Sequence, residues 1–141
     1  MKIASKLTIV LSAVFAVALT ASADDSAAAP KVLPPASTKT GVTYDTDIKP
    51  ILDKSCVKCH SGDRPKARLK LDTLEAVLKG SRNGAVVIVG DSAKSLIVQA
   101  VAHTADDEDV WMPPAKAAGR FPPLTADQIG LIRAWIDQGA K

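Results

Sequence analysis

The stretch Cys56-Val57-Lys58-Cys59-His60 contains both cysteines of this 141-residue chain and one of its two histidines. Thiol and imidazole side chains at this spacing can form a disulfide or a redox dithiol, bind a metal ion, or attach a cofactor covalently. A redox dithiol of this kind belongs near a βαβ pattern, and the sequence has no such pattern. A structural disulfide here would close a loop too small to add much stability.

Zinc and covalent haem are the two cofactor hypotheses for this motif. Zinc would take Cys56, Cys59 and His60, with His103 as a fourth ligand. Adjacent Cys59 and His60 are awkward donors for one tetrahedral ion, and His103 follows too far along the chain for a zinc finger. Cys-x-x-Cys-His is the signature of c-type haem attachment, in which the cysteines form thioethers and the histidine binds the iron. The motif therefore favours one covalently attached haem c on Cys56, Cys59 and His60.

A haem iron bound by His60 needs a second axial ligand or keeps an open position. Met112 is the only methionine besides Met1, and two prolines follow it in the stretch Trp111-Met112-Pro113-Pro114. A lone methionine beside a tryptophan is often ordinary core filling. A stiff, non-helical segment suits a fixed ligand better than adaptable packing. Met112 is therefore expected to be the distal iron ligand, with His103 as the alternative.

The N-terminus is typical of a secretory signal peptide over residues 1–23. Lys2 and Lys6 come first, residues 7–20 form an uncharged apolar run, and Ala21-Ser22-Ala23 fits a cleavage site. The apolar run is shorter than the roughly 20 residues that span a bilayer. We therefore expect a periplasmic or otherwise exported protein that is soluble, with no stable membrane span, once the signal peptide is removed.

Charge and composition limit the possible partners and the domain organisation of the rest of the chain. Two of the 18 basic residues leave with the signal peptide, and 16 remain against 15 acidic residues, so nucleic-acid binding has no electrostatic support. Residues 24–42 are rich in Ala, Pro, Ser and Thr, which is typical of a linker. Residues 43–141 suffice for one small domain with few aromatic residues. A large apolar cofactor would compensate for such a marginal core.

The pattern of apolar residues predicts an all-α domain, with about four helices and long loops wrapped around the haem. Helices are expected over residues 46–55, 71–80, 92–102 and 125–138. Capping boxes are predicted at Asp72 with Glu75 and at Thr125 with Gln128. Residues 85–89, of which all but Ala85 are β-branched, are expected to form one short strand or an extended pocket wall.

Three stretches, "YDTDIKPILDKSCVKCH", "WMPP" and "LTADQIGLIRAWIDQGA", resemble a class I-type monohaem cytochrome c and, more narrowly, the planctomycete-type cytochrome c domain. The resemblance covers residues 42–140. It implies thioethers from Cys56 and Cys59, proximal iron ligation by His60 and distal ligation by Met112. It also implies that the first and last helices pack against each other through Ile48, Ile51, Leu52, Ile132, Trp135 and Ile136.

With both axial positions filled by protein, one-electron transfer is the remaining chemistry. We therefore expect a monomeric electron carrier that docks on redox protein partners and is not an enzyme. One alternative is a haem enzyme or gas sensor with an open or labile sixth position. The other is an electron-transfer subunit that residues 24–42 tether to a larger oxidoreductase.

Polar and charged residues surround the motif. The second ring nitrogen of His60 is expected to donate to a carbonyl within residues 61–65. The acidic residues 106–109 are expected to be solvated. Lys54 and Lys58 are candidates for weak electrostatic docking of a partner. A second basic group is a candidate for haem propionates or for a partner, with a solvated face as the alternative: Arg64, Lys66, Arg68 and Lys70.

Overall fold

The computed structural model describes residues 31–117 and 119–141, and these residues form a helical fold without a β-strand. The prediction of an all-α domain of about four helices is confirmed. The predicted signal peptide and residues 24–30 of the predicted linker lie outside the described residues. Within the described ranges, no helix is long and apolar enough to cross a bilayer. The α-helices are α1 (Lys49–Ser55), α2 (Leu74–Lys79), α3 (Leu96–Val101) and α4 (Ala126–Asp137).

The first helix begins slightly earlier than predicted, as a π-helical turn over Tyr44–Ile48 that continues into α1. The N–H of Lys49 donates to the carbonyl of Tyr44, and Pro50 follows within the first turn of α1. A proline is tolerated at that point because its missing N–H would have no partner inside the helix. The turn buries Tyr44 and Ile48 on the side that faces the core.

The start of α2 differs from the prediction by one residue. Thr73, and not Asp72, is the N-cap, and its side chain accepts a hydrogen bond from the N–H of Ala76. Gly80 ends the helix as predicted, with φ +82°. A Cβ at this position would lie 2.5 Å from the carbonyl oxygen of Gly84, so the turn requires glycine. Residues 85–89 form no strand, so the strand alternative for this segment is wrong.

Helix α3 is shorter than predicted, because residues 92–95 form turns instead of a first helical turn. Ser92 and Ser95 are buried, and their hydroxyls donate to the Asp137 carboxylate (2.9 Å) and to the Asp91 carbonyl (2.9 Å). Serine hydroxyls that bind other groups in this way compete with helix formation. The apolar spacing alone did not reveal this competition.

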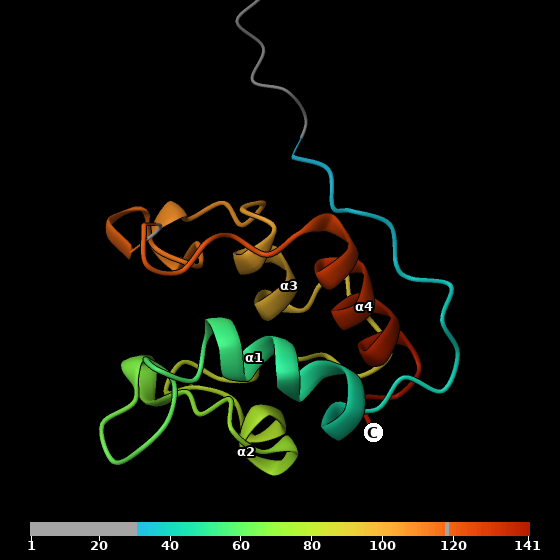
Figure 1. Ribbon diagram of the computed structural model, residues 1–141, viewed down its shortest axis with the longest axis horizontal. Coiled ribbons are helices and arrows are strands. Elements are labelled where there is room, and N and C mark those ends of the chain that lie inside the picture. The colour runs from blue at the N-terminus through green and yellow to red at the C-terminus, as the bar shows by residue number, and fades with distance from the viewer. Residues whose placement is uncertain (1–30, 118) are drawn as a thin grey trace, which may run out of the picture.

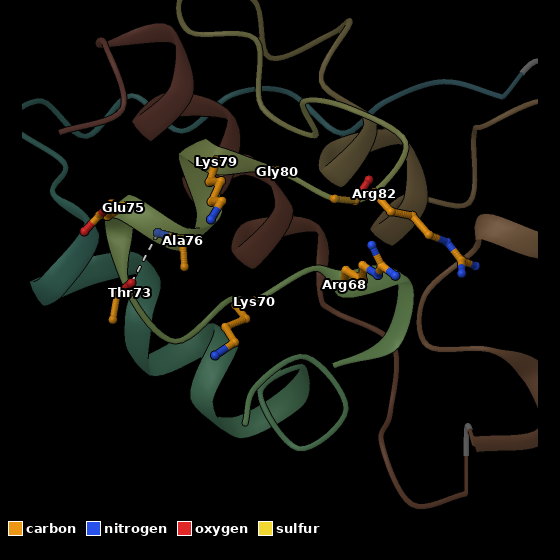
Figure 2. A pocket seen from close by; sticks show the side chains of 9 residues that line it. Arg68, Lys70, Thr73, Glu75, Ala76, Lys79, Gly80 and Arg82 are labelled. Atoms are coloured by element: carbon orange, nitrogen blue, oxygen red, sulfur yellow. Dashed lines mark hydrogen bonds between the residues drawn. The ribbon is translucent and has the colours of Figure 1, made fainter. Parts of the chain in front are cut away.

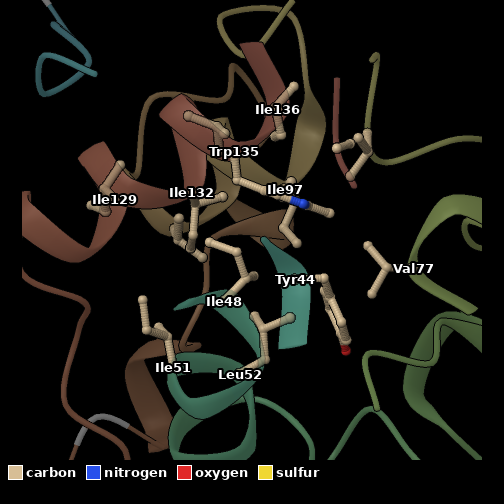
Figure 3. Packing of buried hydrophobic residues seen from close by; sticks show 14 of the residues in the cluster. Tyr44, Ile48, Ile51, Leu52, Val77, Ile97, Ile129, Ile132, Trp135 and Ile136 are labelled. Carbon is tan, nitrogen blue, oxygen red and sulfur yellow. The ribbon is translucent and has the colours of Figure 1, made fainter. Parts of the chain in front are cut away.

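Helix α4 matches the prediction closely. Thr125 and Gln128 form the predicted capping box, and Gly139 lies just beyond the end of the helix. Figure 3 shows the buried face of α4 opposite the first helix, as the family resemblance implied. The rings of Tyr44 and Trp135 lie 5.9 Å apart at the centre of this contact. One core cluster contains all six residues expected at the interface: Ile48, Ile51, Leu52, Ile132, Trp135 and Ile136.

The segment before the first helix, residues 31–42, is extended and lies along α4; we call it the N-terminal strap (Figure 1). The N–H of Ser37 donates to the carbonyl of Gly130 (2.8 Å), and the Arg133 guanidinium donates to the carbonyl of Pro34. Val42, at the end of the strap, is buried in the core cluster. Composition indicated a linker here but gave no sign of these contacts.

Candidate functional site

The cysteine motif follows α1 directly. Cys56 ends that helix, with its N–H on the carbonyl of Leu52 (2.7 Å), and the N–H groups of Cys59 and His60 both donate to the carbonyl of Cys56 (3.1 Å each). This tight turn brings the two thiols and the imidazole together on one short piece of backbone. Cys59 is exposed and Cys56 is half-buried, and the two are not joined by a disulfide.

Burial raises the pKa of the Cys56 thiol to about 11, and the neighbouring Cys59 adds to the shift. Reactive dithiols have the opposite property, because a lowered pKa supplies the thiolate that attacks a disulfide. The Cys56 thiol therefore stays protonated at neutral pH. This environment argues against a redox dithiol and is compatible with cysteines that serve as attachment points.

His60 is buried, with 8% of its surface exposed. Its Nδ1 lies 3.3 Å from the carbonyl oxygen of Leu69, so this nitrogen carries the proton and donates. Burial lowers the pKa of the ring, against a smaller opposite effect of the backbone groups of Leu69 and Lys66. The ring is therefore neutral at neutral pH, and its Nε2 keeps a lone pair for a metal ion.

The acceptor for His60 lies outside the expected range, residues 61–65. The chain turns after the motif and returns beside it, and the N–H of Leu71 donates to the carbonyl of His60 (2.8 Å). This return brings the carbonyl of Leu69 to the ring. The expectation was wrong because it considered only residues next in sequence, while the contact depends on the path of the turn.

Met112 lies in the segment between α3 and α4 and is half-buried against the core cluster. Its N–H donates to the carbonyl of Ala100 in α3 (3.0 Å), and its carbonyl lies 3.1 Å from Nε2 of His103. His103 is thus half-buried beside Met112. Figure 1 shows this segment at the same end of the molecule as the turn that follows α1.

The zinc hypothesis receives no support from this arrangement. In residues 31–117 and 119–141, no group of three or more His, Cys, Asp or Glu side chains could hold a metal ion. The acidic residues 106–109 are exposed and form no such group either. A thioether, a neutral imidazole and two unbridged thiols are instead the donor set of a c-type haem.

Residues 56–116 match the family described as Planctomycete cytochrome C. This part of the chain is a planctomycete-type cytochrome c domain. The match contains all four candidate haem residues, from Cys56 to Met112. Comparisons with curated proteins and with solved structures gave no match. A cytochrome c domain implies haem c and generally serves electron transfer with redox partners, not catalysis.

The cytochrome c domain also has a basic hollow of about 550 Å³ beside α2 (Figure 2). Four exposed cations line it, Arg68, Lys70, Lys79 and Arg82, with Glu75 as the one carboxylate. None of the four forms an ion pair with another described residue. The sequence singled out Arg68 and Lys70 but not Lys79 and Arg82, which the turn at Gly80 brings to the same surface. The lining contains none of the candidate haem residues.

Proposed function

We propose that the protein is an exported monohaem c-type cytochrome that carries single electrons between redox protein partners. Cys56 and Cys59 would hold the haem through thioethers, and His60 and Met112 would be the residues that bind its iron. The bound haem supplies reversible one-electron exchange between Fe(II) and Fe(III). The protein residues would attach the group and fix its ligands.

The observation that carries this proposal is the state of His60. The ring is buried, neutral and oriented by the Leu69 carbonyl, and it follows an unbridged Cys-x-x-Cys pair directly. A histidine that binds a metal almost always donates its other ring N–H to an acceptor of this kind. An ordinary core histidine would not require two cysteines at that spacing, neither of which forms a disulfide.

The assignment of Met112 has its own support. The backbone of Met112 is hydrogen-bonded on both sides, through its N–H to Ala100 and through its carbonyl to His103. A segment held in this way can present a thioether at a constant position. His103 fits the role of iron ligand less well, because its Nε2 is already engaged with the Met112 carbonyl.

Export and partner docking are proposed from the sequence and from the family. The predicted signal peptide and the general export of cytochrome c domains favour a periplasmic site, where haem is attached. Lys54 and Lys58 are exposed and remain candidates for weak docking on an acidic partner. The contacts of the strap with α4 leave residues 31–42 less free to act as a tether to a larger enzyme.

Substitution of Met112 tests whether this residue occupies the sixth coordination position of the iron. We expect reduced wild-type protein to resist carbon monoxide at neutral pH, and Met112→Ala to bind it rapidly and to have a lower reduction potential. Leu78→Ala, which truncates an exposed apolar side chain of α2, is a matched control and should behave as wild type. Rapid binding by the wild type would favour the open-site enzyme or sensor. An unchanged potential in Met112→Ala would exclude Met112 as the ligand.

A further inference from the structure

The segment that carries Met112 is attached to the end of α3 by a specific turn. His103 adopts φ +56°, a left-handed conformation that few non-glycine residues adopt. The N–H of Thr104 then donates to the carbonyl of Gln99 (2.9 Å), which reverses the chain. The turn directs the His103 side chain back toward the Met112 backbone, where Nε2 lies 3.1 Å from the carbonyl oxygen.

The His103 ring is fixed on its face as well as at its edge. It stacks on the indole of Trp111, with the rings nearly parallel at 3° and the centroids 5.1 Å apart. This is an offset-stacked arrangement, which is favourable for aromatic rings. The indole Nε1 donates to the carbonyl of Ala105 (3.0 Å), and the Lys31 ammonium lies 5.0 Å from the indole centroid. The ring therefore has little freedom to leave the Met112 carbonyl.

The hydrogen bond to a carbonyl defines the chemical role of His103. A carbonyl oxygen only accepts, so Nε2 must carry a proton and donate it. That nitrogen then has no lone pair for a metal ion. His103 is suited to hold the backbone of a ligand residue, and not to bind the iron through Nε2.

We propose that His103 is a positioning residue for Met112: its Nε2–H fixes the Met112 carbonyl and so keeps the Met112 thioether available to the haem iron. This inference rests on the proposed function, since it presupposes that Met112 is the distal ligand. Loss of the donor leaves the two prolines after Met112 in place but frees the carbonyl. The ligand then competes less well with added small ligands.

The test compares His103→Gly with the wild type in the haem-loaded protein, with imidazole as the competing ligand of the ferric iron. Glycine removes the ring without strain at the left-handed position. We expect imidazole affinity to rise about fivefold to tenfold, the equilibrium equivalent of one net hydrogen bond. His103→Gln keeps a side-chain N–H donor and should raise the affinity less than His103→Gly does. The reverse order would overturn the hydrogen-bond explanation.

A control separates positioning from general loss of stability. Thr125→Ala removes the cap of α4 and lowers stability at a site whose side-chain hydrogen bond is to Gln128 and not to the Met112 segment. It should leave imidazole affinity unchanged, and an equal rise in both variants would overturn the inference. If the wild type lacks the charge-transfer absorption of Met-ligated ferric haem, the proposed function fails first. If that absorption is present and His103→Gly binds imidazole as the wild type does, only the positioning role fails.

Discussion

Substitution of Gly130 by alanine tests how the N-terminal strap packs on α4. Gly130 lies in the interior of that helix, where alanine is ordinarily more stable than glycine by about 1 kcal/mol. Here an added Cβ would lie 2.7 Å from the carbonyl oxygen of Pro35 and 3.4 Å from the backbone nitrogen of Ser37. The first distance is too short for a carbon–oxygen contact, and both atoms belong to the backbone. The strap must therefore move away from the helix.

The size of the effect follows from the contacts that this movement breaks. The hydrogen bond from Ser37 to the Gly130 carbonyl contributes about 1 kcal/mol. The hydrogen bond from the Arg133 guanidinium to the Pro34 carbonyl has a charged donor and contributes about 1.5–3 kcal/mol. After the helix-propensity gain is subtracted, Gly130→Ala should destabilise the protein by about 1.5–3 kcal/mol.

Urea denaturation followed by far-UV circular dichroism measures this free energy of unfolding. The matched control is the same substitution in a chain that begins at Lys39 and so lacks the part of the strap that faces Gly130. In this shortened chain Gly130→Ala should raise the free energy of unfolding by about 1 kcal/mol, because only helix propensity changes. A stabilisation of that size in the full chain would refute the packing of the strap on α4.

Two further predictions concern the core and the cap of α4. Tyr44 is the only tyrosine of the chain. Desolvation by burial raises the pKa of its phenol to about 12, and nearby carboxylates add a smaller effect: Asp53, Asp72 and Asp45. Because the folded state holds this proton more tightly than the unfolded chain, stability should fall as pH rises from about 10, the ordinary value. Absorbance titration of the phenol in apoprotein checks this shift, and a midpoint near 10 in folded protein would contradict the buried position. Thr125→Ala should lower the free energy of unfolding by about 1 kcal/mol through loss of the capping box, whereas Thr125→Ser should leave it nearly unchanged. An equal loss of stability in both variants would show that the hydroxyl is not the cap.

The parts of the fold that sequence reasoning predicted depend on local signals. Helix α4 has its cap, its apolar face and its glycine stop within one short stretch, and all three are confirmed. The start of α2 and the length of α3 were predicted less accurately. Thr73, and not Asp72, caps α2, and the hydrogen-bonded hydroxyls of Ser92 and Ser95 replace the first predicted turn of α3. The bond from Ser92 to Asp137 joins positions 45 residues apart, and no local pattern indicates it.

In the candidate site, too, the sequence predicted the local features and missed the contacts that depend on the path of the chain. Cys56, Cys59 and His60 lie within residues 56–60, and their spacing favoured haem attachment over a disulfide or a zinc site. The Leu69 carbonyl has no sequence signal, since any residue provides a carbonyl. The link between His103 and Met112 depends on a left-handed turn that His103 itself adopts, which apolar periodicity does not predict. Side-chain hydrogen bonds to backbone carbonyls therefore could not be predicted from the sequence.

The most direct test of the central claim, covalent haem on Cys56 and Cys59, is a pyridine haemochrome spectrum. The full chain is produced with haem-maturation machinery, denatured, and freed of any non-covalent haem before the spectrum is recorded. We predict one haem per chain with the absorption of a haem bound through two thioethers, and the single-thioether absorption for Cys56→Ala. Protein without haem, with two free thiols or with bound zinc, would contradict the account.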